Sequence, residues 1–167
     1  ISHYSQVVEK TTSVSVDGSY PVTQIFDGDT IEVNMDGNKE KVRFIGVDTP
    51  ETHDPRKSVQ CFGKTAHAFT VKTIGNSRVR LESDPKSTDR DRYNRLLRYV
   101  YTDSNILINS EIIKQGYGFA YTGFEFTKSD EFKRLQQEAR DRKLGLWSDC
   151  TPRANEFGGF TSNDEKN

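Results

Sequence analysis

Several features that are common in other classes of protein are scarce in this 167-residue chain. Hydrophobic residues make up only 32% of it, and no apolar run approaches the roughly 20 residues needed to cross a bilayer, so we predict no membrane partner. The three histidines, His3, His53 and His67, lack the spacing of zinc ligands. A glycine-rich loop of the kind that cradles nucleotide phosphates is also missing, which argues against a nucleotide hydrolase.

An excess of charge of either sign is absent as well. The chain has 24 Lys and Arg residues against 25 Asp and Glu residues, for a net charge of −1. This balance excludes a protein that holds nucleic acid by bulk positive charge. Any nucleic acid partner must therefore be bound by local positive charge, and the densest basic stretch runs from Arg90 to Arg98.

Length and composition predict one domain with polar ends. We assign residues 1–19 to a polar lead-in that either adds an edge strand or is disordered. Residues 20–150 form the domain. Residues 151–167 are rich in Gly, Asn, Asp, Glu and Lys, so we predict a disordered tail.

The hydrophobic pattern predicts five strands and three helices. The strands are expected at 20–26, 30–35, 40–47, 78–82 and 96–101, and the helices at 62–74, at 109–115 with Asn109 as its cap, and from Thr127 or Ser129 to about Arg142. A three-stranded meander followed by a helix, with further helices at the end, indicates an α+β fold. The architecture that fits is a small five-stranded Greek-key barrel of the oligonucleotide-binding (OB) type.

Two short acidic segments, Asp27-Gly28-Asp29-Thr30 and Asp48-Thr49-Pro50-Glu51, are the first candidate site. Taken singly, the first is also explained by ordinary turn chemistry and the second by a strand end with a proline stop. Taken together, carboxylates in two turns can converge on a hard cation, which takes roughly 6–8 oxygen ligands when it is calcium.

Two arginines accompany the acidic segments. Arg43 shares a strand face with Ile45 and Val47, so it needs an anionic partner, either a structural carboxylate or a phosphate. Arg95 ends the segment Asp91–Arg95, which alone could be a solvated loop. Because a guanidinium fork matches two phosphoryl oxygens, arginines beside oxygen ligands indicate phosphodiester chemistry.

The order and spacing of four motifs resemble the staphylococcal nuclease (thermonuclease) family over about residues 22–148. The motifs are Asp27–Thr30, Arg43–Glu51, Asp91–Arg95 and Leu144-Gly-Leu-Trp147. The resemblance implies an OB barrel with three helices. It also implies a calcium-dependent nuclease, a hydrolase of DNA and RNA with little sequence specificity that leaves 3′-phosphates. We expect a monomer that prefers single-stranded substrates.

The resemblance further implies which residues bind calcium and which carry out catalysis. Asp29 and Asp48 match carboxylate ligands of Ca²⁺, Thr49 matches a ligand through its main-chain carbonyl, and Asp27 matches an acid close to the metal. The catalytic residues would be Arg43, Glu51 and Arg95. Glu51 would act as general base, and the arginines would stabilise the transition state electrostatically, since arginine scarcely loses its proton.

Substrate contacts are implied as well. Arg92 and Tyr93 match residues near a terminal phosphate, although relatives often carry Lys at the first position, and Gly where this chain has Asn94. Tyr121 matches a base-stacking tyrosine, and Gly123 or Phe124 occupies the second such position, depending on the alignment. Packing in the core is the competing explanation for these aromatic residues.

Only two cysteines are present, Cys61 and Cys150, without C-x-x-C spacing. The residues alone allow either two buried thiols or a disulfide. The resemblance favours the disulfide, and hence a secreted or periplasmic protein.

An alternative function is a non-catalytic, nuclease-like barrel that binds nucleic acid or protein. The chain retains every candidate catalytic and metal-binding residue, which favours the enzyme.

Overall fold

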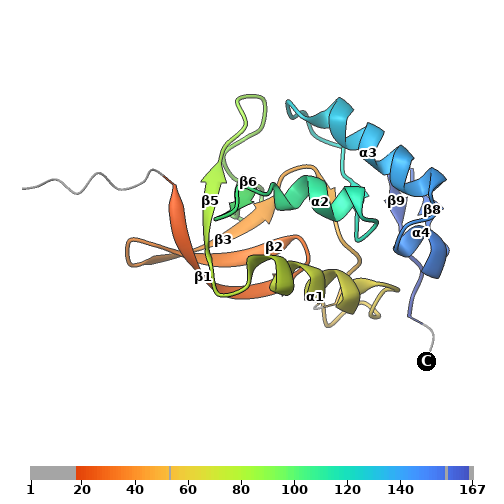
Figure 1. Cartoon of the computed structure of the whole chain (residues 1–167), viewed down its shortest axis with the longest axis horizontal. Helices are drawn as coiled ribbons and strands as arrows, with labels where there is room; N and C mark the ends of the chain where they lie inside the picture. Colours follow the sequence, from red (N-terminus) through yellow and green to blue (C-terminus); the bar gives the residue numbers. More distant parts are fainter. Residues whose placement is uncertain (1–17, 53, 157, 166–167) are drawn as a thin grey trace, which may run out of the picture.

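A five-stranded barrel forms the body of the protein in the computed structural model, which describes residues 18–52, 54–156 and 158–165. The barrel strands are β1 (Ser19–Asp27), β2 (Thr30–Met35), β3 (Asn38–Phe44), β5 (Arg78–Glu82) and β6 (Leu96–Thr102). Their order is β1-β2-β3-β6-β5, and pairing of β1 with β5 closes the barrel. Only the β3–β6 pair is parallel among these (Figure 1). The predicted OB fold is confirmed.

The barrel closes because apolar side chains alternate along its strands. Ile31 and Val33 on β2, Val42 on β3, and Val79 and Val100 on the last two strands are all fully buried. Intervening residues such as Lys39 and Lys41 remain exposed. This period of two places one face of each strand in a common core.

Four helices are seen among the described residues, where three were predicted. They are α1 (Gly63–Ile74), α2 (Ile108–Lys114), α3 (Ser129–Asp141) and the short α4 (Leu146–Asp149). In Figure 1, α3 and α4 lie beyond α2, on the side of the molecule away from β1 and β5. A small second sheet pairs β4 (Val47–Asp48) with β7 (Phe119–Ala120).

Asn109 is not the helix cap that we predicted, because it lies inside α2 and is fully buried. Its side-chain oxygen accepts the N–H of Val100 at 2.9 Å, and its amide nitrogen donates to the carbonyl oxygen of Ile45 at 2.9 Å. The asparagine therefore joins α2 to the barrel and to the segment that leads into the candidate site.

The prediction of a disordered tail is wrong for the described part of residues 151–167. This part contains a hairpin of β8 (Arg153–Ala154) and β9 (Phe160–Thr161). The ring of Phe160 packs against Phe119 and Trp147, and the predicted disulfide joins Cys61 to Cys150. The composition of this segment gave no sign of the hairpin or of the contacts that Phe160 makes with distant residues.

The predicted lead-in falls almost wholly in residues 1–17, outside the described residues. No helix in the described ranges has both the length and the apolar character required to cross a membrane.

Candidate active site

The β1–β2 turn brings the two acidic segments together. Gly28 lies so close to its neighbours that a Cβ there would come within 2.8 Å of the Thr49 methyl group and 3.1 Å of Ala66 on α1. The hydroxyl of Thr70, also on α1, donates to the carbonyl oxygen of Gly28 at 2.7 Å. Only glycine permits this close approach of the turn to the second acidic segment.

Asp29 and Asp48 are neighbours, as their predicted role requires. Asp29 is almost fully buried, with one oxygen accepting the Thr30 hydroxyl at 2.7 Å and the other the Thr49 N–H at 2.9 Å. The same Nη2 atom of Arg43 lies 3.4 Å from Asp29 and 3.5 Å from Asp48. The two carboxylates therefore share one guanidinium nitrogen.

Arg43 is held by the main chain as well as by the acids. Its Nη1 donates to the carbonyl oxygens of Val47 at 2.6 Å and Phe44 at 3.0 Å. Burial opposes the charged form, but Asp29 and Asp48 more than offset it, so the pKa of Arg43 lies above its ordinary value. The guanidinium is charged and fixed in direction.

The acidic side of the site carries more negative charge than Arg43 balances. The pKa of Asp48 is raised to about 6, first by loss of hydration and then by the charges of Asp29 and Glu51, while Arg43 lowers it. Carboxylates forced together in this way are stabilised by a cation. Their oxygen atoms are the donors that Ca²⁺ prefers.

Carboxylates alone do not form a complete metal site. No group of three or more His, Cys, Asp or Glu side chains is arranged to hold a metal in the ranges described. Two carboxylates with the carbonyl of Thr49 remain compatible with Ca²⁺, which also accepts carbonyl and water ligands. The buried hydroxyl oxygen of Thr49 has no hydrogen-bond partner in the protein, so one more oxygen atom beside the carboxylates is available to a ligand or water.

Glu51, in the loop after β4, and Asp27, the last residue of β1, both have defined contacts near these carboxylates. One carboxylate oxygen of Glu51 accepts the N–H groups of Thr52 at 3.1 Å and Asp54 at 2.9 Å. The side chain of Asp27 accepts a hydrogen bond from the Thr52 hydroxyl. Neither acid lines the pocket beside Arg43 that is described below, whereas Asp48 does.

The Asp91–Arg95 segment is a compact turn that fixes Arg95. The Asp91 carboxylate accepts the Arg95 side-chain Nε at 2.7 Å and the N–H groups of Tyr93 at 2.9 Å and Arg95 at 3.0 Å. Asn94 has φ 65°, in the left-handed region that asparagine tolerates better than most residues. This explains how the chain dispenses with glycine at that position.

Arg92 and Tyr93 form an exposed pair on the same turn. The Arg92 guanidinium lies 4.9 Å from the centre of the Tyr93 ring and donates to its hydroxyl at 2.8 Å. Tyr93 is 65% exposed, so a flat aromatic face and a cation are both available to a ligand.

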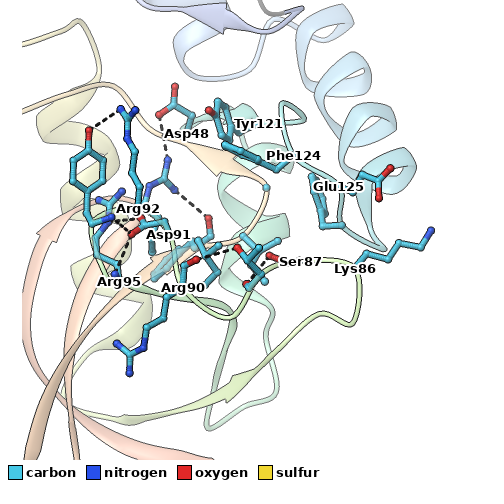
Figure 2. A pocket seen from close by; sticks show the side chains of 18 residues that line it. Asp48, Lys86, Ser87, Arg90, Asp91, Arg92, Arg95, Tyr121, Phe124 and Glu125 are labelled. Carbon is cyan, nitrogen blue, oxygen red and sulfur yellow. Dashed lines mark hydrogen bonds and ion pairs between the residues drawn. The ribbon is translucent and has the colours of Figure 1, made fainter.

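Both candidate phosphate-binding arginines, Arg43 and Arg95, line one pocket of about 720 Å³. Figure 2 shows Arg95 in this pocket together with Asp48 and Tyr121. Its walls include six of the residues predicted for the site: Arg43, Asp48, Arg92, Tyr93, Arg95 and Tyr121. Phe124 also lines it and is 72% exposed, with its ring 5.9 Å from that of Tyr121. The sequence left open whether Gly123 or Phe124 supplies a second aromatic surface, and the exposed ring of Phe124 provides one.

The fold and this pocket define a class of protein, an OB barrel whose acidic turns and arginines are equipped for phosphodiester chemistry. Residues 41–149 match the model of the family described as staphylococcal nuclease homologue. The chain therefore belongs to that family, as the motifs indicated.

Relatives of known name cover most of the chain. A thermonuclease from Staphylococcus intermedius is 41% identical over 83% of this chain and 82% of the relative. A thermonuclease from Staphylococcus hyicus is 37% identical over 78% of this chain and 76% of the relative. Endonuclease YncB from Bacillus subtilis is 37% identical over 87% of this chain and 66% of its own length.

Proposed function

We propose that this protein is a calcium-dependent nuclease that hydrolyses DNA and RNA with little sequence specificity. The observation that carries the proposal is the common pocket, because Arg43, Asp48 and Arg95 line it together. The family and the endonuclease names of the relatives support a nuclease function. The acidic pair beside Arg43 supports the calcium requirement.

In the proposed reaction, water attacks phosphorus and the bond from phosphorus to the 5′ oxygen breaks, which leaves a 3′-phosphate and a 5′-hydroxyl. Glu51 accepts the proton of the attacking water. Arg43 and Arg95 bind the equatorial phosphoryl oxygens, whose negative charge grows in the transition state. The leaving oxygen acquires its proton from solvent, because both arginines stay charged.

Calcium would be held by the carboxylates of Asp29 and Asp48 and the carbonyl of Thr49, where it supplies a Lewis acid that neutralises phosphoryl charge. Asp27 would support the same site through its contact with Thr52. Two carboxylates leave room for water and substrate oxygens as further ligands.

Substrate would lie along the pocket with its bases exposed to the aromatic rings. Tyr121 and Phe124 present neighbouring ring surfaces, and base–aromatic stacking tolerates any sequence. Arg92 and Tyr93 would contact a terminal phosphate. Bases are free to stack in this way only in single strands, which supports the proposed preference for them.

The Cys61–Cys150 disulfide supports a location outside the cytoplasm, because disulfides persist in oxidising compartments. We therefore propose a secreted or periplasmic protein. We further propose that it acts as a monomer.

The proposal is tested by incubating DNA and RNA with the protein in calcium, in magnesium and in excess chelator, and following fragments on gels. We expect cleavage with calcium and none with chelator, and we expect Glu51→Gln to be inactive even with calcium. Undiminished cleavage in chelator would remove the metal from the proposal. Binding without cleavage under every condition would favour the non-catalytic barrel.

A further inference from the structure

Glu51 and Gln60 close the loop between them by two reciprocal hydrogen bonds. The N–H of Glu51 donates to the side-chain Oε1 of Gln60 at 2.8 Å, and the N–H of Gln60 donates to the carbonyl oxygen of Glu51 at 2.9 Å. Residues 55–58, at the far end of this loop, are exposed. The N–H of Glu51 is therefore held by a residue at the other end of a loop whose residues 55–58 are exposed.

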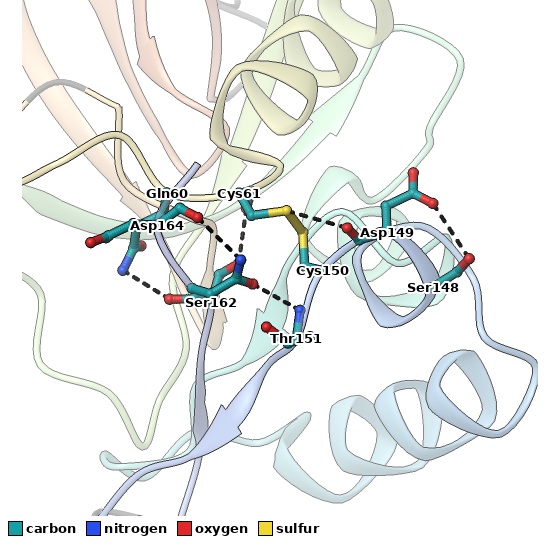
Figure 3. Close-up of a disulfide and its surroundings, with 9 residues drawn as sticks. Gln60, Cys61, Ser148, Asp149, Cys150, Thr151, Ser162 and Asp164 are labelled. Atoms are coloured by element: carbon teal, nitrogen blue, oxygen red, sulfur yellow. Dashed lines mark hydrogen bonds between the residues drawn. A yellow bond between two sulfur atoms is a disulfide. The ribbon is translucent and has the colours of Figure 1, made fainter. Parts of the chain in front are cut away.

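The C-terminal segment Ser162–Glu165 in turn holds Gln60 in place (Figure 3). Gln60 forms an antiparallel bridge with Asp164, and its side-chain nitrogen donates to the Ser162 carbonyl at 3.4 Å. The adjacent main chain is bonded on both sides. The N–H of Cys61 donates to the main-chain carbonyl of Asn163 at 2.7 Å, and the N–H of Glu165 donates to the main-chain carbonyl of Val59 at 2.8 Å.

Covalent and apolar contacts keep this C-terminal segment on the body. The disulfide joins Cys61, next to Gln60, to Cys150 at the end of α4. The N–H of Thr151, the residue after Cys150, donates to the side-chain oxygen of Asn163 at 2.8 Å. Phe160 stacks on Phe119 at a centroid distance of 6.2 Å. The chain that leads into this segment is thus anchored at the disulfide and again at Phe160.

We propose that Gln60 is a positioning residue for Glu51, and that the disulfide-anchored C-terminal segment keeps Gln60 in position. The inference rests on the proposed function, in which Glu51 is the general base. Removing the Gln60 side-chain oxygen leaves the Glu51 N–H without this acceptor, so only one of the two reciprocal bonds that close the loop remains. Displacement of a reacting group by about 1 Å can cost on the order of a hundredfold in rate.

The direct test compares Gln60→Leu, which removes the acceptor, with Gln60→Glu, which keeps an acceptor oxygen. Gln137→Leu, an exposed substitution on α3, is the matched control. We expect kcat to fall about tenfold or more in Gln60→Leu, with KM nearly unchanged. Gln60→Glu keeps the acceptor for the Glu51 N–H but loses the donor to the Ser162 carbonyl, so its kcat should fall less than that of Gln60→Leu. The control should stay within about twofold of the wild type. Wild-type kcat in folded Gln60→Leu would overturn the proposal.

A second measurement is independent of activity. Amide hydrogen exchange followed by NMR should show the Glu51 N–H exchanging at least about tenfold faster in Gln60→Leu, while core amides are unchanged. Unaltered exchange at Glu51 would overturn the positioning role. If the wild type cleaves nothing, the proposed function fails, and this exchange result still decides whether Gln60 holds Glu51.

The C-terminal part of the proposal is tested by reduction. Dithiothreitol gives two electrons and two protons to the disulfide and becomes the cyclic oxidised form, leaving two cysteine thiols. We expect reduction to lower kcat severalfold in the wild type and to have little further effect in Gln60→Leu, because both changes act on the same contact. The same relative loss in both proteins would show that the disulfide acts independently of Gln60.

Discussion

At the scale of single residues, the guanidinium of Arg43 serves the local fold and the candidate site together. One of its nitrogens donates to the main-chain carbonyls at the end of β3 and the start of β4, and another faces Asp29 and Asp48. A lysine ammonium has the charge but lacks the planar fork, so it cannot keep both sets of contacts in one fixed direction.

We therefore expect Arg43→Lys to lower kcat by on the order of a hundredfold or more, because a preorganised donor to the phosphoryl group is lost. The retained charge still compensates the acids, so the fold should survive. Steady-state kinetics on a short oligonucleotide, together with thermal unfolding, measure the two effects. Arg134→Lys, on the exposed face of α3, is the control and should change neither. A fully active Arg43→Lys protein would contradict the role given to the fork.

The raised pKa of Asp48 makes a pH-dependent prediction for the metal-free protein. Its folded pKa of about 6 lies above the ordinary value of 3.8, so between these values the folded state holds a proton that the unfolded state has lost. The contribution of Asp48 to stability is present at low pH and is lost as the pH rises to about 6. Because this side chain is 45% exposed, solvent screening should limit the effect to about 1 kcal/mol or less.

Asp48→Asn isolates this contribution from the other acids. In chelator, the free energy of unfolding of the variant minus that of the wild type should increase from pH 4 to pH 7, as measured by denaturant titration. At pH 7 in chelator the variant should therefore be more stable than the wild type. With calcium it should be less stable, since the variant would lose a ligand. A difference that does not change with pH would show that the environment of Asp48 does not disfavour its charge.

At the scale of elements, the Asp91–Arg95 turn depends on one unusual backbone conformation. Asn94 has φ 65°, and the N–H of this residue donates to the Asp91 carbonyl at 3.0 Å. Asparagine and glycine adopt this left-handed conformation readily, whereas a β-branched residue does not.

We expect Asn94→Gly to leave stability within about 0.5 kcal/mol, and Asn94→Val to cost about 1–2 kcal/mol and to reduce kcat by displacing Arg95. Denaturant unfolding and kinetics on both variants give the comparison. Asn76, in the exposed connection before β5, offers a control for asparagine replacement away from the site. Equal stability of the Gly and Val variants would mean that the turn relaxes to another conformation.

The elements that could be predicted from the sequence are those with a local signal. Strand alternation located β2 and β5, and the apolar stripe of Phe132, Leu135 and Ala139 located α3. The β4–β7 pair and the role of Asn109 depend on contacts between distant segments, which no local pattern encodes. For the site, motif spacing predicted that acids and arginines lie together, as Arg43 does with Asp29 and Asp48, but the loop closure by Gln60 had no motif to mark it.

At the scale of the whole molecule, the C-terminal segment completes the domain. The Cys61–Cys150 disulfide spans a sequence separation of 89 residues, with the two Cα atoms 5.9 Å apart. It encloses two of the five barrel strands, β5 and β6, together with helices α1 to α4 in one covalent loop. A cross-link of this length removes much of the freedom of the unfolded chain, and phenylalanine packing at β9 adds apolar burial beside it.

We expect the double variant Cys61→Ser/Cys150→Ser to fold and to lose about 2–5 kcal/mol in its free energy of unfolding, because the unfolded chain regains its freedom. Urea denaturation of the oxidised wild type and of the double variant measures this loss. Dithiothreitol should destabilise the wild type by a similar amount and leave the double variant unchanged, which separates the disulfide from any other effect of the reductant. If the double variant were as stable as the oxidised wild type, the hairpin contacts and not the cross-link would hold the C-terminal segment on the barrel.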